Sequence, residues 1–218
     1  EHKNDEVYIM EEYVKGYVQT FDAIVDSKGQ PLFESGNITP ESIMDIVNDN
    51  RDSTYYLVKD VPENIRSAGL RTIRAFGVKS RFIHLEFFVL TEDQEGLGKK
   101  GDVLGLEVNM RPAGGYTPDM YNYSQETDVY KIWADMVCFD KNTKPIGAHH
   151  YCAFYGRRDG THYKLDDYEI MMKYAGHIVM NGRIPDALSG AMANQMYVGV
   201  FDTEEELNTF YQDLSERF

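Results

Sequence analysis

The sequence predicts an α+β fold with a mostly antiparallel sheet and flanking helices. Three observations lead to it: short β-rich runs separated by turns, several segments with apolar residues at helical spacing, and an apolar content of 42%, enough for a sizeable core. The 218 residues suit one large domain, or a domain with a small lobe. No internal repeat or long linker is evident.

The first part of the chain predicts an antiparallel meander. Residues 7–14 and 17–26 are β-rich and are separated by Lys15 and Gly16. Residues 27–29, Ser-Lys-Gly, are typical of a turn, and a third strand follows near 31–34. Further strands are expected at 82–90, 102–110, 149–155 and 196–201.

Capping residues in front of apolar stripes predict the helices. Asp60, with capping-box spacing to Glu63, marks the start of one helix, and Ser124 is expected to cap another at 125–137. Thr203 is expected to cap a helix at the C-terminal end. The remaining helices are expected at 39–47 and 166–174.

The charge of the chain narrows the classes of partner. Lys and Arg total 22 against 36 Asp and Glu, a formal charge of -14. A general DNA or RNA binder needs a basic face for phosphate contacts, and an anionic membrane surface would repel this chain. A nucleotide is not excluded, because an acidic site can hold one through Mg²⁺.

The two cysteines, Cys138 and Cys152, form no C-x-x-C pair, so we expect buried, reduced thiols rather than a zinc site or a disulfide. No apolar stretch approaches the ~20 residues that a membrane helix needs, and no signal segment is present, which favours a cytoplasmic setting. Because the chain starts at Glu1 without an initiator Met and a strand is expected as early as residue 7, we expect a fragment of a longer protein.

The strand near 103–111 carries the first candidate site. Read with period two, it places Glu107, Asn109 and Arg111 on one face. We expect the other face to pack against the sheet, since it is apolar: Leu104, Leu106 and Val108. A carboxylate, an amide and a guanidinium in a row suggest a cleft, although a solvated strand face is the simpler alternative.

The preceding strand adds a second carboxylate. His84 and Glu86 share a face, and in a hairpin Glu86 would approach Glu107 and Asn109. Two carboxylates and an amide oxygen suit a hard cation such as Mg²⁺ (or Mn²⁺). Arg111 cannot bind a metal ion but can stabilise negative charge. A salt bridge would equally explain Glu86.

The run from Glu107 to Tyr116, EVNMRPAGGY, resembles the C-terminal signature of ATP-grasp enzymes. It is most similar to the carboxylate–amine ligases, the biotin carboxylases and the large-subunit carbamoyl-phosphate synthases. In that family a Glu on the preceding strand and a Glu-x-Asn pair hold Mg²⁺–ATP. The resemblance implies Glu86, Glu107 and Asn109 as metal ligands and Arg111 as the catalytic residue.

A second segment, MEEYVKG at 10–16, is similar to the hinge strand of the same family. There an acidic residue and the adjoining backbone meet the adenine and the ribose. The resemblance implies Glu11 as a nucleotide contact, with backbone groups of Glu12 and Val14 beside it. Asp22, further along the same stretch, is a further candidate, and exposed acidic residues are the alternative explanation.

The resemblance covers roughly 8–128. It implies that residues 1–137 are the C-terminal part of an ATP-grasp domain and that 138–218 form an α/β extension packed on it. The intact parent would activate a small carboxylate as an acyl phosphate with ATP and pass it to an amine or similar nucleophile. Upstream domains of the same chain would be its partners, and a homodimer is possible.

Two alternatives stay open at the level of the sequence. One is a biotin carboxylase or a carbamoyl-phosphate synthase proper. The other is a non-catalytic nucleotide-binding or oligomerisation module, for which the 16 tyrosines would suit a self-association surface. Without the upstream parts, the fragment should bind ATP weakly and turn over nothing.

Overall fold

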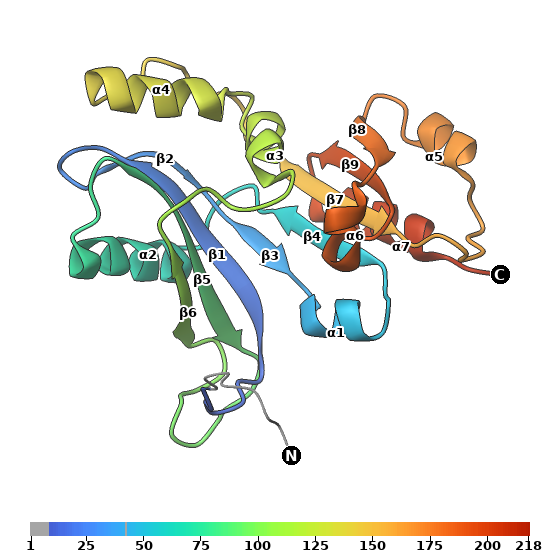
Figure 1. The fold of residues 1–218 in the computed structure, drawn as a ribbon, viewed down its shortest axis with the longest axis horizontal. Coiled ribbons are helices and arrows are strands. Elements are labelled where there is room, and N and C mark those ends of the chain that lie inside the picture. Colours follow the sequence, from blue (N-terminus) through green and yellow to red (C-terminus); the bar gives the residue numbers. More distant parts are fainter. Residues whose placement is uncertain (1–8, 42) are drawn as a thin grey trace.

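The computed structural model describes residues 9–41 and 43–218. Within them, nine strands form one sheet whose strand pairs are all antiparallel, in the order β6-β5-β1-β3-β4-β7-β9-β8, with β2 beside β1 (Figure 1). This confirms the predicted α+β fold. The strands are β1 (Gly16–Val25), β2 (Pro31–Ser35), β3 (Asn37–Thr39), β4 (Ser53–Leu57), β5 (Arg81–Leu90), β6 (Val103–Asn109), β7 (Tyr151–Arg157), β8 (Ile178–Arg183) and β9 (Gln195–Phe201).

Seven helices flank the sheet in the described part of the chain. They are α1 (Ile43–Asn48), α2 (Glu63–Phe76), α3 (Thr117–Ser124), α4 (Val129–Phe139), α5 (Asp167–Lys173), α6 (Asp186–Met192) and α7 (Glu204–Ser215). None of the helices in the residues described here is long and apolar enough to cross a membrane.

Helix α2 packs closely on one face of β1 and β5. Its apolar stripe, which includes Ile65 and Ile73, meets Phe21, Ile83 and the other inward side chains of these strands. Gly69 makes the close approach possible, because a Cβ there would lie 2.3 Å from the Phe21 ring. The glycine inside this helix therefore serves packing, although glycine weakens an isolated helix.

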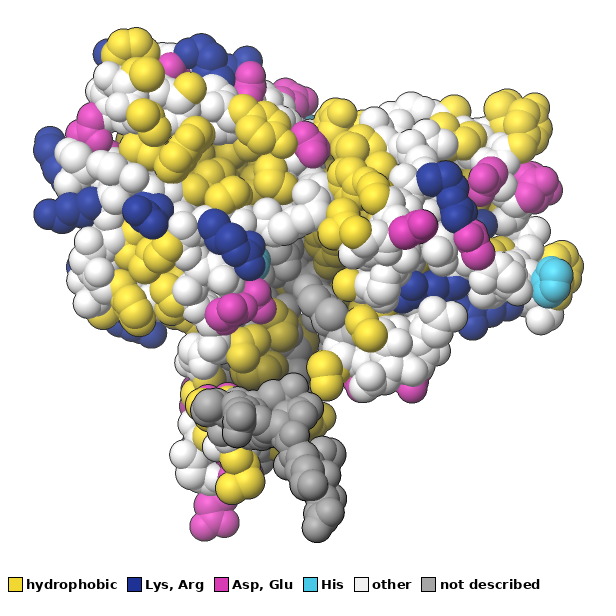
Figure 2. All heavy atoms as spheres, in the orientation of Figure 1, with side chains coloured by type: hydrophobic (Ala, Val, Ile, Leu, Met, Phe, Trp, Pro, Cys, Tyr) yellow, Lys and Arg dark blue, Asp and Glu magenta, His cyan; other side chains and the backbone are white. Residues whose placement is uncertain are grey.

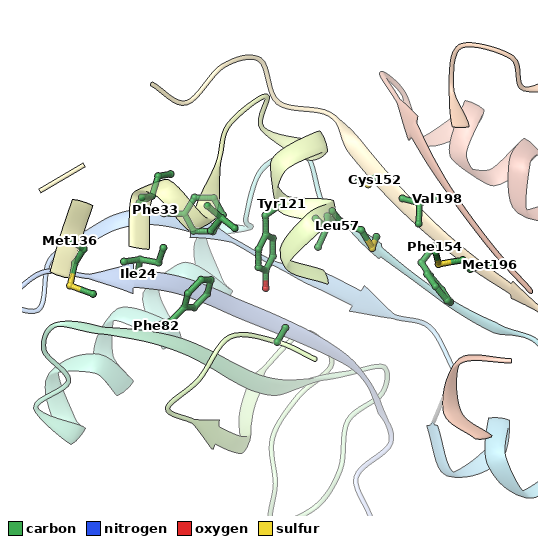
Figure 3. Packing of buried hydrophobic residues seen from close by; sticks show 14 of the residues in the cluster. Ile24, Phe33, Leu57, Phe82, Tyr121, Met136, Cys152, Phe154, Met196 and Val198 are labelled. Atoms are coloured by element: carbon green, nitrogen blue, oxygen red, sulfur yellow. The ribbon is translucent and has the colours of Figure 1, made fainter. Parts of the chain in front are cut away.

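Helices α3 and α4 cover part of the opposite face. Ile24 and Phe82 point up from β1 and β5 toward Tyr121 and Met136, and the same apolar cluster continues to Phe154 on β7 (Figure 3). A further core lies between β7, β9 and helices α5 and α7. Because β4 pairs with β7, the sheet runs without a break through the boundary expected at residue 137.

Three details of the sequence-based elements are wrong. Residues 9–14 form no strand, and β1 begins at Gly16; residues 7 and 8 lie outside the described part. The helix expected at 125–137 begins only at Val129, as α4, because Glu126 takes a left-handed φ of 43° and Asp128, not Ser124, caps it; Ser124 is instead the last residue of a separate helix, α3. Asp60 does not cap α2, whose N-cap position is Pro62.

Other local predictions are confirmed. Thr203 and Glu206 form a capping box at the start of α7, in which each side chain binds the other residue's backbone N–H. Cys152 is a buried free thiol, as expected. Cys138 is exposed on α4, so the expectation of burial was wrong for that cysteine.

Candidate functional site

The site begins where the cover of α3 and α4 ends. Strands β1 and β5 pair along their whole length, from Gly16 opposite Leu90 to Val25 opposite Arg81. Side chains at alternate positions share a face, so the row that buries Phe82 under the helices continues into His84, Glu86 and Phe88. The same sheet surface is therefore core at one end and open to a cavity at the other.

The hairpin of β5 and β6 brings the predicted polar side chains together. Glu86 lies directly opposite Glu107, and His84 lies opposite Asn109. Directly opposed residues of an antiparallel pair project from the same face, with Cβ atoms about 5 Å apart. The predicted juxtaposition of Glu86 with Glu107 is thereby confirmed; binding of a metal ion by these residues stays a prediction.

A bulge interrupts this hairpin next to Glu86. The register shifts between Glu86 and Phe87, so that Leu106 has no direct partner on β5. Leu106 lines the cavity and is 44% exposed, while Val108 is 36% exposed. The expected packed apolar face of this strand was therefore wrong, because β6 is the edge strand of the sheet.

A buried chain of hydrogen bonds lies beneath Glu86. His84 Nε2 is 3.1 Å from Glu86 Oε1, and its Nδ1 is 2.5 Å from Asp22 Oδ1. Thr20 donates its hydroxyl to Asp22 Oδ2 at 2.6 Å. Asp22 is fully buried and His84 is 8% exposed, so this network belongs to the interior.

The charges of the network shift the pKa values of its members. Burial alone would lower the pKa of His84, but the charge of Asp22 and hydrogen bonds to Asp22 and Glu86 outweigh it and raise the pKa to about 10. The hydrogen bond from His84 lowers the pKa of Glu86 against the opposing effect of burial. The raised pKa of His84 favours the imidazolium at neutral pH, and the lowered pKa of Glu86 favours its ionised form.

Asp22 does not have the position expected of a nucleotide contact. Its two carboxylate oxygens face Thr20 and His84, and it forms no part of the cavity wall. Burial under α3, which is distant in sequence, could not be read from the residues around Asp22. Its place in the structure is that of a support for His84.

Arg111 and the turn after it form the next part of the site. Arg111 is exposed, lines the cavity and donates to the carbonyl of its neighbour Pro112 at 3.0 Å. Gly115 has a φ of 61°, and a Cβ there would lie 2.9 Å from the Met192 side chain of α6. The left-handed backbone conformation favours glycine at this position, and the end of the flexible Met192 side chain would have to shift to admit a Cβ.

The cavity runs across the sheet from the β5–β6 hairpin to β4. It has a volume of about 490 Å³ and is walled by β1, β3, β4 and β5, by α1 and α6, and by the turn at 113–115. Figure 2 shows the hollow between the two parts of the molecule, with basic and acidic side chains on its left rim. Glu86 and Arg111 line it, whereas Glu107 and Asn109 stand beside it.

The segment expected to contact a nucleotide lies before β1. Glu11 and Glu12 are exposed and Val14 is half-buried; the cavity wall begins two residues later, at Gly16. Gln94, from the β5–β6 loop, holds this segment: its Nε2 donates to the Tyr13 carbonyl at 3.1 Å, and its Oε1 accepts from Lys15 N at 2.7 Å. Sequence reasoning missed Gln94, because no pattern links a loop amide to a segment far away.

The donor set fits a divalent cation that a nucleotide helps to bind. Among residues 9–41 and 43–218, no three His, Cys, Asp or Glu side chains are arranged to hold a metal ion. Glu86, Glu107 and Asn109 offer two carboxylates and one amide oxygen, and Mg²⁺ usually completes so small a protein set with water and phosphate oxygens. Asn109 Nδ2 is buried without a hydrogen-bond partner among the described residues; this N–H donor suits a phosphate oxygen, whereas only the amide oxygen could bind the cation.

Comparison with solved structures shows that the chain shares its fold with several synthetases and ligases. A phosphoribosylglycinamide synthetase from Anaerococcus prevotii aligns with 93% of this chain and 52% of its own length, at 13% identity and a TM-score of 0.62. An L-amino acid ligase from Bacillus licheniformis covers 93% of this chain and 51% of its own, at 15% identity and a TM-score of 0.63.

A third similar structure was solved with a nucleotide. The N5-carboxyaminoimidazole synthetase from Staphylococcus aureus, complexed with ADP, matches 94% of this chain and 51% of its own, at 9% identity and a TM-score of 0.59. The chain thus spans about half the length of these solved structures. No protein-family model and no curated protein sequence matches it.

Proposed function

We propose that this chain is the metal- and nucleotide-binding part of an ATP-dependent ligase that joins a carboxylate to an amine. The observation that carries the proposal is the placement of Glu86 directly opposite Glu107, beside a cavity that Arg111 also lines. Two facing ionised carboxylates repel each other, and a divalent cation between them would relieve that repulsion. The shared fold with ligases, some solved with ADP or ATP, supports a nucleotide as the other ligand of that cation.

Each predicted site residue except Asp22 has a part in this proposal. Glu86, Glu107 and Asn109 would hold Mg²⁺ or Mn²⁺ together with the phosphates of ATP. The ion, when bound, neutralises phosphate charge during transfer. Glu11, and the backbone of Glu12 and Val14, would meet the base and ribose at the edge of the cavity.

Arg111 would act at the reacting groups. In the first step a carboxylate oxygen attacks the γ-phosphorus of ATP, ADP leaves, and an acyl phosphate forms. In the second step an amine nitrogen attacks the acyl carbon, phosphate leaves, and the nitrogen loses a proton to give an amide. The guanidinium of Arg111 is free to orient the carboxylate and to stabilise charge on the transferring oxygens.

Which carboxylate and which amine the ligase would join depends on residues outside the metal site. A carboxylate–amine ligase is consistent with the structural neighbours, which include the L-amino acid ligase. A biotin carboxylase or carbamoyl-phosphate synthase would share the same metal site and differ in the residues that hold the acceptor.

The test is an assay of the full-length protein for phosphate release from ATP. Phosphate release should require both a divalent cation and a carboxylate, and a panel of carboxylates and amines identifies the pair. Bicarbonate-dependent release without another carboxylate would instead favour the carboxylase or carbamoyl-phosphate alternative. If no combination of carboxylate and amine causes phosphate release from ATP, the ligase proposal is wrong.

A non-catalytic module that self-associates is the second candidate. It is favoured by the outer face of α4, which exposes Trp133 by 38%, Val137 by 61% and the following Phe139 by 62%. Figure 2 shows hydrophobic side chains gathered over this helix. Under this alternative, the full-length protein would form a stable oligomer that the Val137→Lys variant disrupts, and no phosphate would be released from ATP.

A further inference from the structure

We propose that His84, held in place by Asp22, is a positioning residue that fixes the carboxylate of Glu86 for the divalent cation. This inference rests on the proposed function, because it assigns Glu86 to the cation. It adds two residues that take no part in the reaction described above. Both are buried; His84 forms a hydrogen bond with Glu86, and Asp22 forms one with His84.

The geometry leaves the imidazole a single orientation. One ring nitrogen of His84 bonds to Glu86 Oε1 at 3.1 Å, and the other bonds to Asp22 Oδ1 at 2.5 Å. Rotation of the ring would break both bonds in an interior where replacements are scarce. The network thus fixes the carboxylate of Glu86 relative to the backbone of β1.

The far end of the network is anchored in the sheet. Thr20 donates its hydroxyl to Asp22 and accepts a hydrogen bond from the backbone N–H of Asn37 at 2.9 Å. Strands β1, β3 and β5 therefore all contribute to the support. A glutamate side chain has three rotatable torsions, and tying down one oxygen leaves the other free to face a cation near Glu107.

A purely structural role would not account for the direction of the network. A buried Asp22 could be satisfied by Thr20 and any nearby donor in the core. His84 instead passes its second hydrogen bond outward, to a half-buried carboxylate on the cavity wall. Partners that orient a metal ligand are typically worth 10–100-fold in metal affinity, which sets the size of the expected effect.

The experiment is a double-mutant cycle in the full-length protein. ATP binding is measured by calorimetry as Mg²⁺ is varied, and direct Mn²⁺ binding by electron paramagnetic resonance, for wild type, His84→Ala, Glu86→Gln and the double variant. We expect each single variant to raise the half-saturating Mg²⁺ concentration about tenfold. The double variant should be no worse than Glu86→Gln alone, because His84 acts through Glu86.

Two further measurements separate positioning from folding. Imidazole added to His84→Ala should restore part of the cation affinity, since the small ring can occupy the vacated space. His177→Ala is the matched control, because His177 stacks on Phe201 far from the hairpin, and it should leave cation binding unchanged. Where His84→Ala does not fold, Asp22→Asn and His84→Gln take its place in the cycle.

The outcomes are distinguishable. Multiplicative losses in the double variant, or wild-type Mg²⁺ dependence in His84→Ala, would overturn the positioning role while leaving the proposed function standing. A wild-type protein that binds neither Mn²⁺ nor ATP would overturn the proposed function, and this inference with it.

Discussion

Both halves of the sheet carry acidic groups close to the interior, but these groups differ in how fully their hydrogen-bonding capacity is satisfied by other side chains. Before β4, Asp52 accepts hydrogen bonds from the hydroxyls of Tyr155 and Tyr163 and from Arg217. On the hairpin, Glu86 and Glu107 face each other, and among the described residues Glu107 has no ion-pair partner. One cluster is closed on itself, whereas the other is open on the cavity side.

The arginines show the same contrast. Arg158 is buried and donates to three backbone carbonyls, those of Arg51, Ser189 and Gly190. Arg111 is exposed and donates to the carbonyl of Pro112. Closed polar groups hold the fold together, since each satisfies the others. Polar groups whose hydrogen bonds are not all satisfied within the fold cost stability or contribute little to it. Their remaining hydrogen-bonding capacity is available to a ligand.

The largest expected effect comes from opening the closed cluster. Asp52→Ala should lower the free energy of unfolding by about 3 kcal/mol, because two tyrosine hydroxyls and Arg217 lose their acceptor. Urea denaturation followed by circular dichroism measures it. Asp52→Asn, which keeps an acceptor, is the control and should lose less. Equal losses in the two variants would contradict the closed-network interpretation.

Removal of the open arginine should affect turnover rather than stability. Arg111→Ala is expected to lower kcat of the full-length protein about 10²-fold, with ATP affinity changed by much less, because the guanidinium acts on the reacting groups. Its melting temperature should stay near that of wild type. Arg158→Ala is the counterpart and should show the reverse, a lower melting temperature. A large loss of ATP affinity in Arg111→Ala would place Arg111 at the nucleotide instead.

Removing one of the two facing carboxylates should weaken ATP binding without lowering the free energy of unfolding. Glu107→Gln is expected to weaken Mg²⁺-dependent ATP binding roughly tenfold. The free energy of unfolding should stay the same or rise by a few tenths of a kcal/mol, since a repulsion is removed. Calorimetry with ATP at fixed Mg²⁺, alongside urea denaturation, tests both. Unchanged ATP binding would show that Glu107 is a solvated strand residue.

The hairpin and its facing carboxylates could be predicted from the sequence because they depend on local alternation. Period two alone places His84 and Glu86 on one face, and the connection between the two strands is rich in Gly, Lys and acidic residues, which favours a hairpin loop. The bulge beside Glu86 could not be predicted, and it is what turns Leu106 toward the cavity. The separation of α3 from α4 depends on the left-handed φ of Glu126, a residue type with no preference for it.

Burial and distant contacts were beyond the sequence pattern. Asp22 looked like an exposed acid beside a turn, yet the cover that α3 provides makes it fully buried. Gln94 is an ordinary loop residue until the fold brings it against Tyr13 and Lys15. Such roles arise from pairs far apart in the chain, and residue types at short spacing carry no signal for them.

The smallest expected effect is a pH dependence of stability that arises from Asp135, an acid whose hydrogen-bond partners all lie within the fold. Hydrogen bonds from Lys131 and from Thr143 lower the pKa of Asp135 below its usual 3.8. Because the folded pKa is the lower one, the stabilisation is complete above pH 3.8 and is lost as pH falls through the folded value. Asp135→Asn should therefore be less stable than wild type at pH 7, and the difference should vanish in acid.

Thermal unfolding of wild type and Asp135→Asn between pH 2 and pH 7 measures this difference. Glu95 is exposed, so the control variant Glu95→Gln should have the stability of wild type at every pH. A gap between Asp135→Asn and wild type that persists at the lowest pH would mean that Asp135 stabilises α4 by its shape rather than by its charge. A gap that closes would place Asp135 with Asp52, among the acids whose partners lie within the fold. ATP binding of the folded protein should be the same in both variants, since neither residue faces the cavity.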